Sequence, residues 1–269
     1  ANLSGSVDLQ GDLQRQSAQI HLKDKNLRLQ ASLLRTPEQI ALQPFILQHN
    51  QSRLTAQAKW VSTNDQPFEL SGKLERFNVA HFLQGPETSL SASFEASGTS
   101  TPHISGIVDY QIQKSQWARS PMHGSGHVAF NTLQQWRGQA QLHIGNNHIH
   151  ASGDLGPSKD ELELTFDAPT LAQLGLGLAG DLHGRIKWHD SQRSWPDTEI
   201  RLHSKQLDLP GQHRFSGLFV TGQLQRDALA WHANLDSYRD HEQIRLRQLA
   251  IDATGTPSAH DMQVKAQLA

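Results

Sequence analysis

The sequence predicts an all-β protein, and three observations support this prediction. Apolar and polar residues alternate with period two in about twenty runs along the chain, as they do from Leu54 to Trp60. This spacing places every second side chain on the same face of a strand. Turn-forming residues, such as those at 63–65 and 145–147, separate the runs. No stretch of eleven or more residues has helical periodicity.

Two short segments, 78–83 and 169–174, are the exceptions to this pattern. Each has a residue placed to cap one helical turn: Asn78 for the first segment and Asp167 for the second. A side-chain oxygen at that position accepts a hydrogen bond from a backbone N–H that the turn leaves unpaired. We therefore predict one turn of helix in each segment.

The strands are predicted to form an antiparallel meander. The residues between the apolar ones are Gln, Arg, Lys, Asp, His, Ser and Thr, so one face of each strand is solvated, which parallel sheets do not tolerate. Short turns join most neighbouring runs. Open sheets of about twenty strands split, close or curl. Two packed sheets, a pair of barrels and a curled trough all satisfy the pattern.

A loose internal repeat runs through the chain. Residues 49–56 resemble residues 145–152, because in both a polar turn precedes a strand that carries small side chains. Each copy continues with an alternating run and then with one of the two helical segments. Such a repeat is typical of a stacked array, in which each unit buries its apolar face against its neighbours. We predict one continuous array over residues 1–269, with a weak boundary near 131–140.

Composition excludes several classes of protein. No run approaches the 18 or so apolar residues that a membrane-spanning helix needs. The 24 Lys and Arg balance 26 Asp and Glu without forming a basic block, so nucleic acid is not an expected partner. The absence of cysteine excludes disulfides and thiolate zinc sites. The chain begins at Ala1 without Met or a signal sequence, so we expect it to be a piece of a longer protein.

Two motifs suggest cofactors at first sight. Residues 175–180 read G-x-G-x-x-G, but a helical segment precedes them and a strand pattern follows, the reverse of a dinucleotide site. His143, His148 and His150 form the densest histidine cluster. His148 and His150 share the polar face of a predicted strand, and zinc needs three or four convergent ligands. We expect no dinucleotide, no metal and no other cofactor.

Several segments share a similar order and spacing of strands and turns, and not a catalytic motif. They lie at 3–13, 25–29, 142–156, 162–174, 207–211 and 255–260. This order and spacing resembles that of the mid-chain repeats of TamB, the translocation and assembly module family of AsmA-like proteins in Gram-negative bacteria.

The resemblance implies a β-taco, a long curled sheet whose hydrophobic concave face carries phospholipid acyl chains across the periplasm. It implies an inner-membrane anchor and a TamA-like outer-membrane barrel partner, both involving regions outside this segment. It also implies lipid transport between the two membranes, outer-membrane biogenesis and no enzymatic activity.

The residues expected to line the acyl-chain groove are large apolar members of the alternating runs. They are Leu90, Phe94, Val108, Tyr110, Ile112, Leu142, Ile144, Leu162, Leu164, Phe166, Ile186, Trp188, Leu218, Val220 and Trp231. A charge on this face, as in Leu164→Arg or Ile144→Glu, is expected to block the passage of lipid. Burial of each CH₂ group of an acyl chain contributes about 0.8 kcal/mol, and it requires no particular arrangement of polar side chains.

Three other interpretations remain open. The same apolar positions fit the filled core of a β-sandwich. Exposed sheet edges would let the chain act as a scaffold or chaperone that pairs with outer-membrane β-barrel or autotransporter clients. A polysaccharide-binding or cleaving β-solenoid would need facing carboxylates. Asp160 and Glu161 are adjacent in a turn, and Glu163 lies on the polar side of its strand.

Overall fold

The fold is all-β, as predicted. A computed structural model describes residues 3–82, 85–131, 135–156, 160–190, 195–241 and 243–269. Strands make up 77% of the structure, and the nineteen strands of the described residues belong to a single antiparallel sheet that is not closed into a barrel. The strand count matches the roughly twenty alternating runs of the sequence.

The chain divides into two compact units, residues 1–136 and 137–269, at a point within the predicted boundary region 131–140, of which residues 132–134 lie outside the described ranges. Unit 1 contains β1 (Ser4–Gly11), β2 (Gln16–Lys23), β3 (Leu27–Arg35), β4 (Gln39–His49), β5 (Ser52–Val61), β6 (Pro67–Phe77), η1 (Val79–His81), β7 (Thr88–Thr99), β8 (Ser105–Trp117) and β9 (Ser120–Asn131). Strand β10 (Gln135–Ile144) crosses the division. Unit 2 contains β11 (Asn147–Leu155), β12 (Asp160–Ala168), η2 (Leu171–Leu174), β13 (Ala179–Gly180), β14 (Leu182–Asp190), β15 (Asp197–Leu209), β16 (His213–Gln225), β17 (Ala228–Asp240), β18 (Gln243–Thr256) and β19 (Ala259–Leu268).

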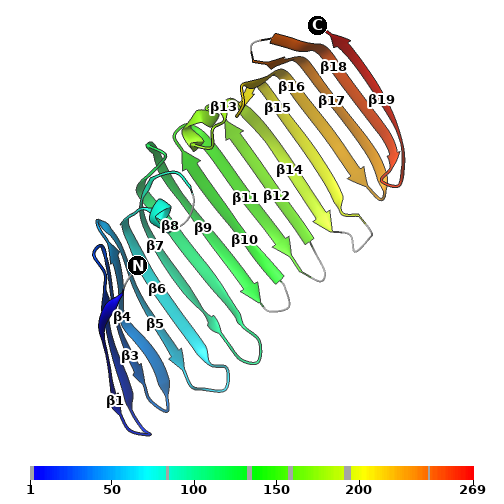
Figure 1. Cartoon of the computed structure of the whole chain (residues 1–269). Helices are drawn as coiled ribbons and strands as arrows, with labels where there is room; N and C mark the ends of the chain where they lie inside the picture. Colours follow the sequence, from blue (N-terminus) through cyan, green and yellow to red (C-terminus); the bar gives the residue numbers. More distant parts are fainter. Residues whose placement is uncertain (1–2, 83–84, 132–134, 157–159, 191–194, 242) are drawn as a thin grey trace. The chain divides into compact units, whose positions relative to one another are not determined.

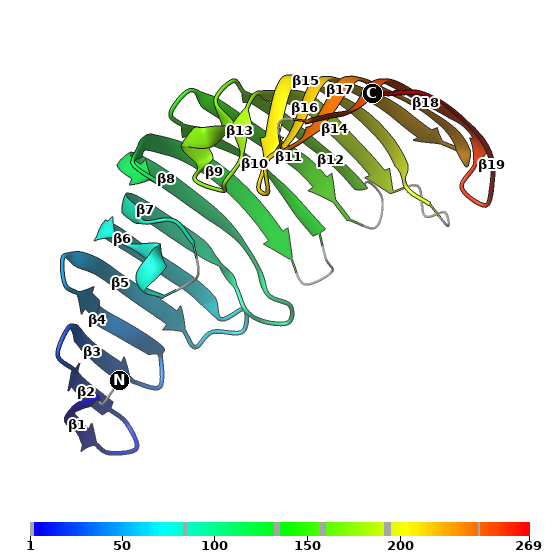
Figure 2. The same cartoon turned by 45° about the horizontal axis from the view of Figure 1, so that its top comes forward.

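Strand order follows chain order within each unit. Each strand from β1 to β9 pairs antiparallel with the next. The same holds from β11 to β19, except that β12 pairs with β14 while the two-residue β13 pairs with β15. Figure 1 shows this side-by-side arrangement, and Figure 2 shows the strands of unit 2 arching along their length. Each unit is thus an open meander of hairpins.

The strands are longer than predicted. The sequence indicated runs of mostly four to eight residues, whereas every strand except β13 has between 8 and 14. In several strands the difference arises at β-bulges, where one extra residue shifts the alternation without ending the strand. In β18, for example, Gln248 has a φ of 56° and the register shifts between Arg247 and Leu249. Bulges also bend the strands that contain them.

Both predicted helical turns are present, as single 3-10 turns. Asn78 caps η1 as expected, with its side chain accepting a hydrogen bond from the Ala80 N–H. The predicted cap of η2 is wrong. Thr170 occupies the cap position, and Asp167 lies within β12, where it pairs with His183 of β14. Leu83, the last residue of the first predicted segment, lies outside the described residues.

Each unit is a single layer rather than a sandwich. Among the described residues, strands make extensive contacts only with their neighbours in the sheet and with η1 or η2. Buried apolar side chains are few, and several are small, such as Ala18, Ala31 and Ala58, which the larger side chains of neighbouring strands cover. The filled sandwich core that the alternation also permitted is therefore not formed within either unit.

Candidate functional site

The strand register of unit 1 aligns apolar residues into rows that cross the strands on one face, which we call the apolar face. Directly opposed residues of an antiparallel pair share a face, so the register identifies each row. Two such rows are Val7–Ile20–Ala31–Phe45–Ala56–Gly72–Phe94–Tyr110–Gly126 and Leu9–Ala18–Leu33–Leu42–Ala58–Leu70–Ala96–Val108–Val128. None of these residues is charged.

Unit 2 repeats the arrangement. Its two most apolar rows are Ile149–Phe166–Gly184–Leu202–Val220–Ala233–Ile251–Val264 and Ala151–Leu164–Ile186–Ile200–Gly222–Trp231–Ala253–Met262. These rows also contain no charged residue. The apolar face of each unit is therefore a continuous hydrocarbon surface several strands wide.

The structure brings the predicted groove residues together within each unit. In unit 1, Phe94 lies opposite Tyr110, and Val108 and Ile112 lie opposite alanines of β7, the strand that also carries Leu90. In unit 2, Leu162, Leu164, Phe166, Ile186, Trp188, Leu218, Val220 and Trp231 all fall on the apolar face.

Leu142 and Ile144 lie at the end of β10, beside the turn into β11, and Ile144 is only 5% exposed. A charge at Ile144 would be buried without a partner, which destabilises the fold. Ile144→Glu is therefore a poorer test of a lipid surface than Leu164→Arg.

Several residues of the apolar face are absent from the predicted set of groove residues. Phe45, Leu47 and Leu54 of β4 and β5, and Ile200 and Leu202 of β15, lie on the same face as the predicted residues. Ile200 and Leu202 show the same alternation, between Glu199, Arg201 and His203, so a search for shorter runs finds them. The β4 residues are harder to find because a register shift between Leu42 and Phe45 breaks the alternation.

The apolar face of each unit is partly open to solvent. Trp60 and Leu162 are each 41% exposed and Trp231 is 36% exposed, although each has strand neighbours on both sides. A contiguous exposed apolar surface of this kind is typical of a binding site for a protein, membrane or ligand.

The pKa of Tyr110, which lies in the first of the two rows of unit 1, depends on how well water reaches the apolar face. Partial burial among the apolar residues raises the pKa of the Tyr110 phenol above its ordinary value, because desolvation disfavours the phenolate. The neutral phenol therefore adds stability to the folded chain below pH 10 or so, and this contribution is lost as the pH rises through the raised pKa.

We expect the phenol of Tyr110 to titrate above about pH 10. The chain has two tyrosines, so a Tyr238→Phe variant leaves Tyr110 as the sole phenol, and absorbance at 295 nm follows its ionisation. A midpoint at or below the ordinary value would show that the apolar face around Tyr110 is well hydrated.

The opposite face carries the charges, and here many of them are paired. In unit 2, Arg185 donates a hydrogen bond to Glu163 at 2.6 Å, and this bond lowers the pKa of the Glu163 carboxyl. At the far end of the β15–β16 pair, which the rows above do not reach, Arg214 has the same effect on the pKa of Asp208. In unit 1, His127 lies 2.7 Å from Asp109. Most such pairs are exposed and contribute little to the stability of the fold, but their charges keep this face hydrated.

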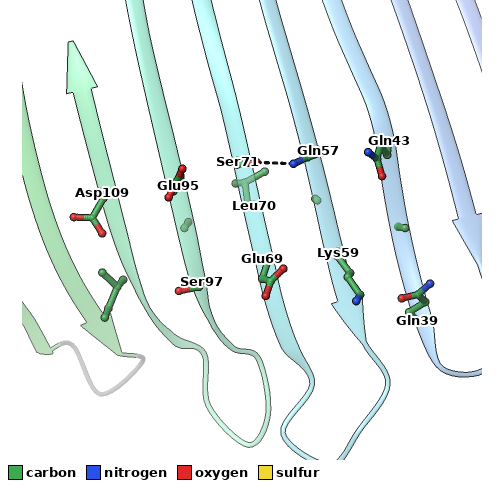
Figure 3. A pocket seen from close by; sticks show the side chains of 14 residues that line it. Gln39, Gln43, Gln57, Lys59, Glu69, Leu70, Ser71, Glu95, Ser97 and Asp109 are labelled. Atoms are coloured by element: carbon green, nitrogen blue, oxygen red, sulfur yellow. Dashed lines mark hydrogen bonds between the residues drawn. The ribbon is translucent and has the colours of Figure 1, made fainter. Parts of the chain in front are cut away.

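A hollow of about 640 Å³ lies on the polar face of unit 1, and sequence reasoning did not predict it. Figure 3 shows its side chains, which come from β4 to β8 and include Gln57, Lys59, Glu69, Glu95 and Asp109. Amides, hydroxyls and carboxylates dominate this lining. Such a surface suits water and polar solutes, so this hollow is not the acyl-chain site that the sequence predicted.

Buried polar side chains, each at the first residue of a strand, hold the two helical turns. Ser52, the first residue of β5, is 2% exposed; it donates to the Arg76 carbonyl and accepts from the Asn78 N–H. Asn147, the first residue of β11, is 0% exposed and exchanges hydrogen bonds with both backbone groups of Thr170. In each half of the chain, the first residue of a strand thus fixes the turn that follows the next strand, although the two residues differ by one position in the alignment of 49–56 with 145–152.

The motifs that suggested cofactors lie where the sequence predicted. His148 and His150 are opposite Asp167 and Thr165 on the polar face of unit 2. The glycine motif at 175–180 connects η2 to β14 by way of the short β13, with a helical turn before it and strands after it. Among the described residues, no group of three or more histidines and carboxylates is arranged to hold a metal ion.

Comparisons with known proteins place the chain in a family. A family model described as "TamB, N-terminal domain" matches residues 1–268. The match spans nearly the whole chain and confirms the resemblance to TamB that the sequence indicates. No curated protein and no solved structure matches the chain. In the part of the chain that the structure describes, no helix is long and apolar enough to cross a membrane.

Proposed function

Because this chain belongs to the TamB family, whose members are transport and assembly modules, we propose that its apolar face shields phospholipid acyl chains during transport between the inner and outer membranes. The observation that carries this proposal is the pair of uncharged rows in each unit, which run from strand to strand in a sheet over which the described residues of that unit place no second layer.

The chemistry of the rows favours a hydrocarbon occupant. In the four rows described above, the phenol of Tyr110 and the indole N–H of Trp231 are the only conventional side-chain hydrogen-bonding groups. A bound protein segment would bring backbone N–H and C=O groups that this face does not satisfy, at a cost for each buried group. An acyl chain brings none, and each CH₂ that it buries contributes about 0.8 kcal/mol.

Family membership supports the setting of this proposal. TamB-family proteins are anchored in the inner membrane and span the periplasm. We propose that this chain is a periplasmic segment of such a protein, that its anchor lies outside the segment, and that a TamA-like barrel is reached through other regions. Lipid carriage of this kind supports outer-membrane biogenesis without any enzymatic step.

Site-specific photocrosslinking tests which face meets lipid. A benzophenone amino acid is placed at Phe94 or Ile200 on the apolar face, and at the adjacent Glu95 or Arg201 on the polar face. The full-length protein is then irradiated in cells whose phospholipids carry ³²P. We expect labelled adducts from Phe94 and Ile200 and not from their neighbours.

Equal labelling from both faces would contradict the proposal. If the apolar positions gave protein adducts and no lipid adduct, the alternative would be favoured, in which the sheet is a scaffold that pairs with β-barrel or autotransporter clients.

A further inference from the structure

Aromatic side chains on the apolar face lie opposite glycines in a recurring pattern. In unit 1, Phe94 pairs with Gly72 and Tyr110 pairs with Gly126. In unit 2, Phe166 pairs with Gly184, and Trp231 pairs with Gly222.

In each pair the ring lies over the glycine rather than standing up from the sheet. A β-carbon added to Gly126 would lie 2.3 Å from Cε1 of Tyr110, and one added to Gly222 would lie 2.7 Å from Cδ2 of Trp231. Added β-carbons would also meet the Phe94 ring at Gly72 and the Phe166 ring at Gly184, at 2.4 and 2.9 Å. Side chains in strands normally stand roughly perpendicular to the sheet. The missing β-carbon is therefore what allows each ring to lie flat.

We infer that Gly72, Gly126, Gly184 and Gly222 are positioning residues that hold the aromatic rings flat, and so keep the apolar face low enough to admit an acyl chain. This inference rests on the proposed lipid-carrying function. A flat ring gives an acyl chain a broad hydrocarbon surface to lie on. A ring that stands up takes the space of the chain and divides the surface into short pockets.

Gly126 and Gly222 give the cleanest test, because the three atoms nearest to an added β-carbon all belong to the facing aromatic side chain. At Gly72 and Gly184 a backbone carbonyl also lies within 3 Å, so substitution there strains the sheet itself. The ring of Tyr110 or Trp231 can move away by rotating about its side-chain bonds. Gly85→Ala is the matched control, since no atom lies within 4 Å of its added β-carbon.

The experiment measures the Kd of the chain for the fluorescent fatty acid cis-parinaric acid, with circular dichroism as a check on folding. We expect Gly126→Ala and Gly222→Ala each to raise the Kd about fivefold, and Gly85→Ala to leave it unchanged. Combining Gly222→Ala with Trp231→Leu should restore binding, because the smaller side chain leaves the surface clear. Folded glycine variants with unchanged Kd would overturn the inference, as would a double variant that binds no better than Gly222→Ala.

A second measurement separates this inference from the proposed function. Rings that lie flat over Gly126 and Gly222 should shift the α-proton resonances of these glycines upfield in the NMR spectrum of the ligand-free chain. Upfield shifts in a chain that binds no probe would contradict the lipid-carrying function. Binding without such shifts would contradict the flat arrangement of the rings alone.

Discussion

Replacing Leu164 with arginine is expected to remove most of the bound phospholipid from the chain while leaving its fold intact. Leu164 lies between Ala151 and Ile186 in an uncharged row of unit 2, and its side chain is half-buried. A guanidinium placed against an acyl chain must lose part of its hydration, and each 1.4 kcal/mol of that cost lowers affinity about tenfold. Without lipid the long arginine side chain can reach water, so the sheet tolerates it.

The measurement for this variant is phospholipid per chain, determined by native mass spectrometry after purification without detergent. We expect at least about a tenfold decrease. Leu164→Ile controls for a change of shape alone. Gln223→Arg adds the same charge on the polar face, opposite Glu199, and should leave lipid content unchanged. A folded Leu164→Arg chain with normal lipid content would rule out acyl-chain contact at this row.

Replacing Asn147 with alanine should cause a large loss of stability in unit 2. The Asn147 amide donates to the Ile144 and Thr170 carbonyls at 3.0 and 2.9 Å, and its oxygen accepts from the Thr170 N–H at 3.0 Å. The side chain is fully buried, so its removal leaves these backbone groups buried without a hydrogen-bond partner. We expect a cost of about 3 kcal/mol in the free energy of unfolding.

Urea unfolding and hydrogen exchange measure this effect. Exchange should accelerate in peptides that cover η2 and the end of β10, while peptides of unit 1 keep their protection. Asn146→Ala is the control in the same turn, because that side chain is exposed; its effect should stay within about 0.5 kcal/mol. Equal effects of the two substitutions would show that the hydrogen bonds of Asn147 do not hold η2.

The strands and the composition of the apolar face are readable from the sequence because the period-two pattern determines both. Leu162, Leu164 and Phe166 alternate with charged or polar residues, and the register then places Trp188, Ile186 and Gly184 beside them. The alternation indicates only that one face of each strand is apolar. It does not state what covers that face, so a filled sandwich and an open layer have the same sequence pattern.

Other features depend on register between strands, which no single run contains. The pairing of Gly222 with Trp231 requires knowing which residues of β16 and β17 face each other. Asn146 and Asn147 are equivalent as turn residues in the sequence, yet one is exposed and the other fully buried, because β11 begins at Asn147. The residue type of Asp167 predicts a cap, whereas the strand continues through it.

The most direct test of the lipid-carrying function is the lipid content of the unmodified chain. The 269-residue chain is purified from bacteria without detergent, its native mass is measured, and bound lipid is extracted and identified. We predict masses that exceed the bare chain by one or more phospholipids, which dissociate on addition of a competing fatty acid. A bare mass from a folded chain, together with no uptake of added phospholipid, would contradict acyl-chain binding by the apolar face.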